Sequence, residues 1–191
     1  MAGRRRQPPP LALKTRLMLS MRLFIPILAR TLHTVALSLW LGGLVAIGAL
    51  VAPTAFHVTR SAPAFAGNLP LQNAIAGGVV GGSLHLFTFV CYACGFLLLL
   101  ANTLLLRHSH RRWTLAAIIV TCLLLGTAFT LGLYLTPTMA AAQAHGDRTT
   151  FDRLHHLYEQ VSSVVQMPLL LLLALFGALR DTPSKEVEKD A

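Results

Sequence analysis

The sequence predicts an all-α integral membrane domain, a bundle of four transmembrane helices. Four apolar segments contain no Asp, Glu, Lys or Arg: residues 31–52, 83–106, 113–135 and 161–179. Each has close to the ~20 residues that an α-helix needs to cross a hydrocarbon layer of ~30 Å. The composition agrees, because 54% of the 191 residues are hydrophobic and only 12% are charged. We therefore expect one transmembrane domain over residues 31–179.

The distribution of Lys and Arg predicts the orientation of this domain. Residues 1–30 contain seven, the three successive connections contain one, three and two, and the sequence after the fourth segment contains three. With a cytoplasmic N-terminus, 13 of the 16 basic residues lie inside and 3 lie outside, which is a strong positive-inside bias. We expect both termini in the cytoplasm and the protein in the cell (cytoplasmic) membrane. The net charge of +9 then reflects topology, and nucleic acid is not an expected partner.

The segments that flank this domain have different compositions. In residues 1–30, apolar side chains recur at helical spacing among basic ones, at Leu13, Leu17, Met21, Phe24 and Leu28. This pattern is typical of an amphipathic helix on a membrane surface, so we predict a partly disordered or interfacial segment that binds anionic lipids. The alternative is a basic flank without lipid specificity. Residues 180–191 mix acidic and basic side chains and are expected to form a disordered tail.

Several residues are expected to mediate helix packing. Trp40 follows His33 by two helical turns, so both lie on one face, and glycine beside Trp40 lets a neighbouring backbone approach closely. Proline ends both the first and the third segment. The predicted packing residues are His33, Trp40, Gly42, Gly43, Pro53 and Pro137. Two overlapping GxxxG pairs at residues 77–82 have the same expected role.

A weak internal repeat concerns the organisation of the domain. Val-Ala-Pro-Thr at 51–54 ends the first segment and Leu-Thr-Pro-Thr at 135–138 ends the third. Leu-His occurs at 84–85 in the second segment and at 154–155 just before the fourth. Two related helical hairpins with the same orientation would produce this pattern. Coincidence in a Leu- and Ala-rich sequence is the alternative.

Polar residues on one face of the fourth helix are the strongest chemical signal. Asp152, His155, Glu159, Ser162 and Gln166 are separated by three, four, three and four residues, which places them on one helical face. Polar groups in hydrocarbon are unfavourable unless they face the bundle or a water-filled cavity. We therefore predict a pocket open to the extracytoplasmic side. Its predicted lining residues are His85, His155, Glu159, Ser162 and Gln166.

Histidines concentrate near this predicted pocket. Imidazole suits copper or zinc, which gives a candidate metal set of His85, His155 and His156. The alternative is that these interfacial histidines bind loops and water. His33 could ligate haem, but a six-coordinate haem needs a second ligand at similar depth on another helix, which we do not find. We expect no cofactor, with a metal ion or haem as the alternatives.

Five separated motifs follow one another along the chain. They are Leu-His with Leu-Trp-Leu-Gly-Gly at 32–43, Ala-Pro-Thr-Ala-Phe at 52–56, Ala-Gly at 66–67, Thr-Pro with Met at 136–139, and residues 151–155. Together they resemble the transmembrane protein 205-like family, also called the family of domain of unknown function 4149. The resemblance implies a four-helix integral membrane domain and no settled activity. The family places Ser and Asn after the last-helix His, where this sequence has Tyr158 and Ser162. The first motif also resembles copper-resistance D-type membrane proteins and membrane protoporphyrinogen oxidases, over one helix only.

These observations favour a non-enzymatic binding or accessory module of the membrane. The alternatives are a copper- or zinc-handling or transport protein that uses the outer histidines, and a haem-linked membrane oxidoreductase. The sequence contains no G-x-S-x-G, P-loop or H-E-x-x-H motif, so nucleophilic or zinc-protease catalysis has no support. Cys91 and Cys94 form a C-x-x-C within an apolar segment, where thiols are unreactive, and we interpret them as packing residues.

Overall fold

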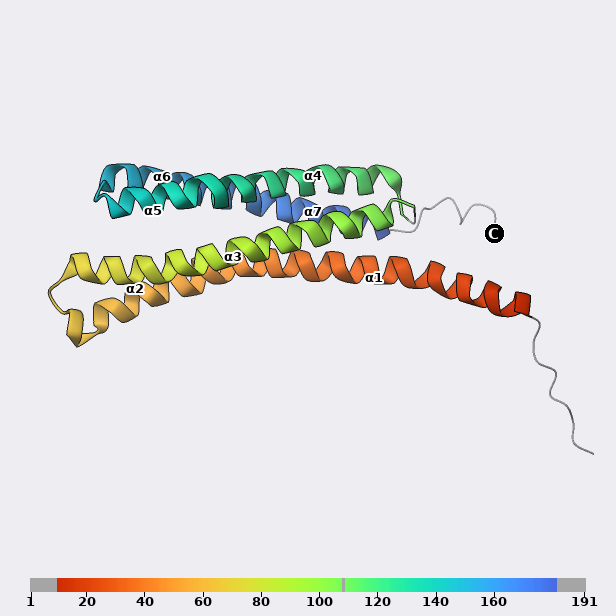
Figure 1. The fold of residues 1–191 in the computed structure, drawn as a ribbon, viewed down its shortest axis with the longest axis horizontal. Coiled ribbons are helices and arrows are strands. Elements are labelled where there is room, and N and C mark those ends of the chain that lie inside the picture. Colours follow the sequence, from red (N-terminus) through yellow and green to blue (C-terminus); the bar gives the residue numbers. More distant parts are fainter. Residues whose placement is uncertain (1–9, 108, 182–191) are drawn as a thin grey trace, which may run out of the picture.

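The computed structural model describes residues 10–107 and 109–181, and their backbone is almost entirely helical (Figure 1). The all-α prediction is therefore confirmed. Residues 1–9, the first part of the predicted N-terminal segment, and residues 182–191, most of the predicted charged tail, lie outside the described residues. Helix α7 (Met167–Asp181) includes residues 180 and 181, which were predicted to belong to the charged tail.

The first two of four long helical rods form a hairpin. The first rod consists of α1 (Pro10–Ala46), a π-helical turn η1 (Ile47–Val51) and α2 (Ala52–Ser61). A short 3₁₀ turn, η2 (Pro63–Phe65), leads to the second rod, which is the single helix α3 (Leu69–Leu105). The chain thus reverses its direction near residues 62–68 and runs back along the first rod (Figure 1).

The third and fourth rods form a second hairpin. The third rod consists of α4 (Arg111–Thr130), a π-helical turn η3 (Leu131–Leu135) and α5 (Thr136–Ala144). The fourth consists of α6 (Arg148–Gln160), a π-helical turn η4 (Val161–Gln166) and α7. We call the end where α1 begins and α7 ends the terminal end, and the end where both hairpins turn the hairpin end (Figure 1).

Among the described residues, four helical stretches are long and apolar enough to cross a membrane. They are Phe24–Ser61, Leu69–Leu105, Arg111–Ala144 and Arg148–Arg180. At 33 to 38 residues each, they measure ~50–57 Å, which exceeds the ~30 Å of a hydrocarbon layer. The four predicted spans are thus found, but each rod is longer than its predicted span. The connections at the hairpin end are themselves mostly helical.

The core of the bundle lies toward the terminal end. There α1 packs against α3, α3 against α4 and α4 against α7, and a contact between α1 and α7 closes the ring. This is the up-down-up-down arrangement of a four-helix bundle. Fully buried side chains from all four rods fill it, including Trp40, Leu98, Leu124 and Leu170. Toward the hairpin end, α2 packs against α3 and α5 against α6.

Each of the three π-helical turns ends two residues before a proline, at Pro53, Pro137 and Pro168. The residue just before each proline donates its N–H to the carbonyl five residues back: Ala52 to Ile47, Thr136 to Leu131 and Met167 to Ser162. Proline has no N–H, and its ring clashes with the carbonyl four residues back. The wider turn relieves that clash and lets the rod continue. Pro53 and Pro137 are exposed, so their predicted packing role is corrected to this local one.

The two hairpin turns are built alike. Each contains a glycine with positive φ, Gly67 (79°) and Gly146 (71°), a conformation that only glycine adopts freely. The next residue then caps the following helix: Asn68 Oδ1 accepts the Leu71 N–H at 3.2 Å, and Asp147 Oδ1 accepts the Thr150 N–H at 3.0 Å. The first rods of both hairpins also share the π-helical turn before proline. The second rods differ, since α3 is one regular helix, so the relation between the hairpins stays a prediction.

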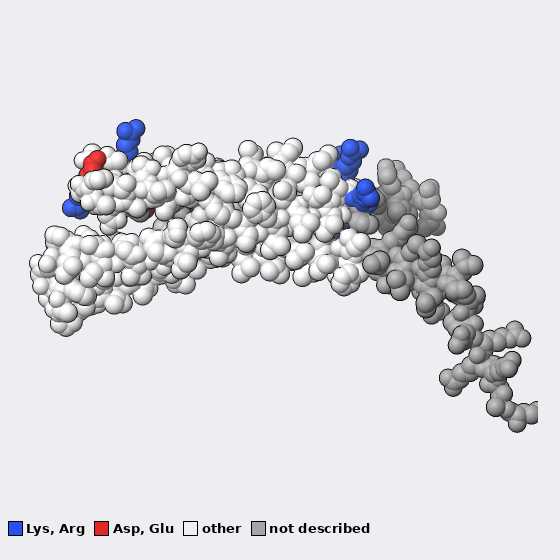
Figure 2. Space-filling view, in the orientation of Figure 1, with Lys and Arg blue, Asp and Glu red and all other residues white. Residues whose placement is uncertain are grey.

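Charged side chains lie at the two ends of the molecule. On the face shown in Figure 2, Lys and Arg appear at the terminal and hairpin ends, and the long middle section carries neither acidic nor basic residues. Large apolar side chains such as Leu86, Phe89, Ile119 and Leu133 are exposed along the rods. An uncharged band with an apolar exterior is what a bilayer requires of a helical protein.

Candidate functional site

The fourth rod begins at a capped terminus. Besides the backbone N–H of Thr150, Asp147 interacts with the Thr150 side chain, and these hydrogen bonds lower the pKa of the Asp147 carboxyl from its ordinary value of 3.8. A carboxylate is also favourable at the positive end of the helix dipole. Helix α6 therefore begins close to residue 150, so that Asp152, the first residue of the predicted polar face, already lies in the helix.

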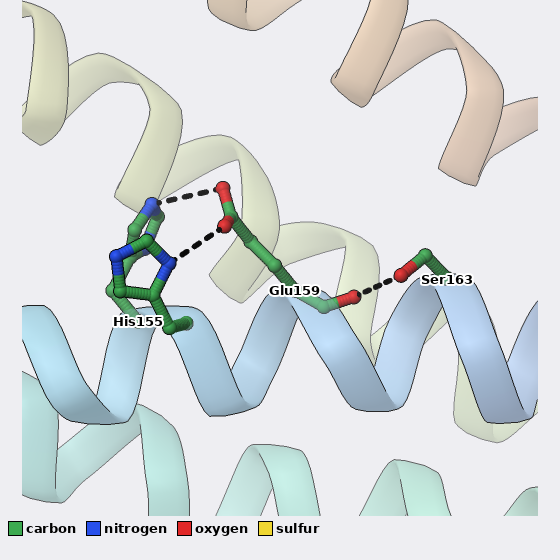
Figure 3. Close-up of polar contacts among 4 residues, drawn as sticks. His155, Glu159 and Ser163 are labelled. Atoms are coloured by element: carbon green, nitrogen blue, oxygen red, sulfur yellow. Dashed lines mark hydrogen bonds and ion pairs between the residues drawn. The ribbon is translucent and has the colours of Figure 1, made fainter.

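A histidine–glutamate cluster lies on α6. Glu159 Oε1 is 3.3 Å from His155 Nε2, and Glu159 Oε2 is 3.4 Å from His156 Nδ1. Figure 3 shows the side chains of His155 and Glu159 on the face of α6 turned away from α5, while Ser163 Oγ donates to the Glu159 carbonyl oxygen at 2.6 Å. The Glu159 side chain is 57% exposed. The two imidazoles thus hold one accessible carboxylate by both of its oxygens.

Gln166 lies in a different environment from Glu159. It is only 2% exposed, and its Nε2 donates to Thr127 Oγ1 of α4 at 3.3 Å. The intervening η4 turn explains the difference, because a π-helical turn contains an extra residue and rotates the residues after it by about 100° relative to a regular helix. The predicted stripe of one continuous polar face is therefore corrected: it breaks between residues 159 and 166.

A small cavity lies inside the bundle, between the two hairpins. Its lining comes from all four rods and includes Thr88, Tyr158 and Gln166 among apolar side chains such as Leu44 and Leu131. Its volume of about 10 Å³ has room for about one water molecule. Of the predicted pocket residues only Gln166 lines it, and Tyr158 is a lining residue that the stripe did not include.

Ser162 and His85 complete the predicted pocket set. The Ser162 Oγ is buried and has no hydrogen-bond partner among the described residues. His85 is exposed on α3, and its ring meets the Phe89 ring edge-on at a centroid distance of 5.3 Å. His85 is therefore not a lining residue of the cavity.

The predicted metal set is not brought together. In the part of the chain that the structure describes, no three His, Cys, Asp or Glu side chains form a group placed to hold a metal ion. His155 and His156 share Glu159, while His85 belongs to another helix and contacts Phe89.

A polar network near the terminal end was not predicted from the sequence. Arg180 of α7 is 5% exposed, and its Nη1 donates to Asn102 Oδ1 of α3 at 2.9 Å. The Asn102 Nδ2 in turn lies 3.4 Å from Thr121 Oγ1 of α4. Asn102 is the one Asn within residues 83–106, and a lone amide in an apolar span signals an interhelical hydrogen bond.

Some of the predicted packing residues lie at close contacts between helices, and others do not. Trp40 is fully buried, and a Cβ at Gly43 would overlap the Phe87 ring, so both lie at close contacts of α1 with α3. His33 is 3% exposed. A Cβ added to Gly177 of α7 would lie 3.5 Å from the His33 Nε2. At Gly42 a Cβ would meet no described atom within 4 Å, so the packing role predicted there is corrected.

The GxxxG glycines and the cysteines were also expected to pack. Cβ atoms at the four glycines of residues 77–82 would meet no described atom within 4 Å, so the expected packing is not found there. Cys91 and Cys94 are buried as free thiols, and Cys122 is exposed.

Comparison with known proteins identifies the family. The model of a domain of unknown function, DUF4149, matches residues 35–148, which run from within α1 through α5 to the first residue of α6. Glu159 and Gln166 lie beyond the matched residues. No curated protein and no solved structure shows significant similarity to the chain. Because the match spans more than half of its length, the chain belongs to the DUF4149 family of domains of unknown function.

Proposed function

We propose that this multi-pass membrane protein is a non-enzymatic binding or accessory module whose hairpin end takes a small polar ligand. The observation that supports it is a set of polar groups along the fourth rod, which runs from the exposed Glu159 to the buried Gln166 across the break in the polar face. Between them the buried Ser162 Oγ has no hydrogen-bond partner among the described residues. Buried polar groups without partners are unfavourable, and a bound polar molecule or water would satisfy them.

The chemistry of the cluster suggests which groups the ligand carries. Glu159 offers an exposed carboxylate that His155 and His156 approach at 3.3 and 3.4 Å, and the buried Ser162 hydroxyl, later on the same rod, is a further donor and acceptor. A ligand with a cationic or hydrogen-bond-donating group would match this arrangement. Tyr158 and Gln166 would contact the deeper part through the small cavity.

We propose further that the hairpin end faces away from the cytoplasm. The terminal end carries Arg107, Arg111, Arg112 and Arg180, which agrees with the positive-inside bias of the whole chain. Alkaline phosphatase fused after Ala191 should be inactive, whereas phosphatase inserted between Ala66 and Gly67 should be active. The reverse result would overturn the orientation and place the site on the cytoplasmic side.

Metal handling is the second candidate, and one observation favours it. His155 and His156 lie 3.3 and 3.4 Å from the Glu159 carboxylate, and these are ligand types that zinc and copper accept, although the three described side chains are not placed to hold a metal ion together. A metal ion would need rearranged side chains and further ligands. The resemblance of the first motif to copper-resistance D-type proteins stays a prediction.

A ligand screen with matched variants tests these proposals. The full chain in detergent micelles is tested for thermal stabilisation by a panel of small polar amines, amino acids, carboxylic acids, Zn²⁺ and Cu²⁺. For a compound that binds here, Glu159→Gln should weaken binding about tenfold or more, because a hydrogen bond to a charged group is lost. Gln166→Leu should weaken it less. Asp152→Asn and Gln160→Leu, two exposed positions on the same helix, are the controls.

The outcomes separate the candidates. Stabilisation by an organic compound that depends on Glu159 supports the binding module. Stabilisation by Zn²⁺ or Cu²⁺ that a His155→Ala, His156→Ala variant loses supports metal handling. If nothing in the panel stabilises the protein, or if the control variants weaken binding as much as Glu159→Gln, the proposed site is wrong.

A further inference from the structure

A furrow separates the two hairpins toward the hairpin end. The main contacts between the hairpins, α3 with α4 and α1 with α7, lie nearer the terminal end. Farther out, α2 packs against α3 and α5 against α6, and these two pairs diverge (Figure 1), which leaves the furrow between them in Figure 2. The small cavity that Thr88 of α3 and Tyr158 of α6 help to line lies at the inner end of this furrow.

One wall of the furrow consists of glycines. On α3, Gly81 precedes Thr88 by two helical turns, and Gly77 and Gly78 precede Gly81 by one more. They therefore continue, toward the hairpin end, the face on which Thr88 lines the cavity. A Cβ at any of these three glycines would meet no described atom within 4 Å. This wall thus leaves room for a ligand that approaches α6.

The opposite wall is polar. His155, Tyr158 and Glu159 share one face of α6, because they are separated by three and one residues within a regular helix. Tyr158 lines the cavity together with Thr88, so this face is turned toward α3. Figure 3 shows His155 and Glu159 on the side of α6 that faces away from α5. The Glu159 side chain is 57% exposed and is therefore accessible from the furrow.

Glu159 also lies at the level where lipid headgroups begin. Residues 160–179, between Glu159 and Arg180, contain no Asp, Glu, Lys or Arg. About 20 residues of α-helix measure ~30 Å, which is the thickness of a hydrocarbon layer. With Arg180 at one surface of that layer, Glu159 lies at the other. The furrow, which runs from Glu159 toward the hairpin end, then opens among the headgroups of the surrounding bilayer.

The groups on the polar wall match a headgroup that carries both an ammonium and a phosphate. A carboxylate accepts short, strong hydrogen bonds from an ammonium group. His155 and His156 lie 3.3 and 3.4 Å from the Glu159 carboxylate, and a protonated imidazole donates to a phosphate oxygen from its second nitrogen. The buried Ser162 Oγ, without a hydrogen-bond partner among the described residues, lies ~5 Å deeper along the rod. That is the depth of the ester carbonyls of a phospholipid, which accept hydrogen bonds.

We propose that the polar ligand of the hairpin end is the headgroup of a phospholipid with a primary ammonium group, such as phosphatidylethanolamine. Glu159 accepts hydrogen bonds from the ammonium, the phosphate lies beside His155 and His156, and the headgroup occupies the furrow against Gly81. The acyl chains stay in the bilayer. This inference deepens the proposed function and rests on it, because both assign ligand binding to Glu159.

Native mass spectrometry of the full chain in detergent micelles tests the lipid class. Phosphatidylethanolamine, phosphatidylcholine and phosphatidylglycerol are compared with identical acyl chains. The first should bind most tightly, because the quaternary ammonium of phosphatidylcholine has no N–H to donate and phosphatidylglycerol has no cation. Thermal stabilisation by ethanolamine, which is the same amine without the lipid, is measured in parallel.

Matched variants test the two walls. Glu159→Gln should weaken the binding of phosphatidylethanolamine about tenfold or more, because hydrogen bonds to a charged group are lost. Gly81→Leu should weaken it at least as much, since the new side chain would occupy the furrow. Asp152→Asn, at an exposed acidic position of the same helix, and Gly126→Leu, at an open glycine of α4, are the controls and should leave binding unchanged. Circular dichroism verifies that each variant folds.

The outcomes separate this inference from the proposed function. Preference for phosphatidylethanolamine that Glu159→Gln and Gly81→Leu lose and both controls keep supports the inference. If the three lipids bind equally, or if Gly81→Leu changes nothing, the lipid surrounds the bundle without a site and the inference is wrong. If ethanolamine or another soluble compound binds through Glu159 and the lipid does not, the proposed function stands and only the inference falls. If no compound and no lipid depends on Glu159, both are wrong.

Discussion

Gly95 should be a position where the bundle core is sensitive to a single added methyl group. In α3, a Cβ at Gly95 would overlap the Leu125 side chain of α4 and stand 3.2 Å from Cζ3 of Trp40 in α1. Trp40 is fully buried and Leu125 is 7% exposed. Three rods thus meet at this point, and an added methyl group has to displace buried side chains.

The magnitude comes from a matched pair of substitutions. At Gly126, on α4 beside Leu125, a Cβ would meet no described atom within 4 Å. Gly95→Ala and Gly126→Ala both gain up to about 1 kcal/mol from the better helix propensity of alanine, so this contribution cancels in the comparison. The remaining difference is the cost of overpacking at Gly95, about 1–3 kcal/mol. Gly126→Ala should be neutral or stabilising.

Equilibrium unfolding in mixed micelles, followed by tryptophan fluorescence, measures the difference. A Leu125→Ala variant removes the side-chain atoms that overlap the new methyl group. The double variant should therefore be more stable than the sum of the single effects predicts, by about 1–3 kcal/mol. If Gly95→Ala is as stable as Gly126→Ala, or if the double-variant effects simply add, the close approach of α1, α3 and α4 is wrong.

Three further perturbations test separate parts of the structure. Asn102→Leu should lower the free energy of unfolding by about 2 kcal/mol, because it removes the acceptor that Arg180 uses; unchanged stability in the same unfolding assay would refute the network. The lowered pKa of Asp147 means that its cap stabilises α6 at pH values above 3.8 and is lost as the pH falls through the lower folded pKa. The protection of the Thr150 amide against hydrogen exchange, measured relative to the intrinsic exchange rate at the same pH, should decrease over that range, and Asp147→Asn should abolish this pH dependence. N-ethylmaleimide in detergent should modify Cys122 well before the two buried cysteines, and equal rates would contradict the packing of α3.

The four spans could be predicted because the hydrophobic effect acts on each segment separately. A run of about 20 apolar residues specifies a membrane helix whatever its neighbours are. The buried Trp40 and the close approach at Gly43 also followed from residue type and spacing. Contacts between rods were harder to predict. Asn102 and Arg180 are 78 residues apart in the sequence, and no local pattern indicates that they form a hydrogen bond.

The candidate site was only partly predictable for a different reason. The spacing from Asp152 to Gln166 assumed about 3.6 residues per turn throughout. Pro168 widens the preceding turn, and that single residue decides which way Glu159 points relative to Gln166. The same proline signal was present at Pro53 and Pro137, where sequence reasoning interpreted it as packing.

The extra residue in each π-helical turn determines what the deletion of one residue there would do to the rod. Losing one residue from Val161–Gln166 would remove the extra residue of the wide turn, and the helix would continue with a kink where the Pro168 ring meets the carbonyl four residues back. The side chains of Arg148–Gln160 would then be presented about 100° around the axis, while Met167–Asp181 kept its contacts. Single-residue deletions at these three places would change which side chains the part of the rod before the turn presents to its neighbours.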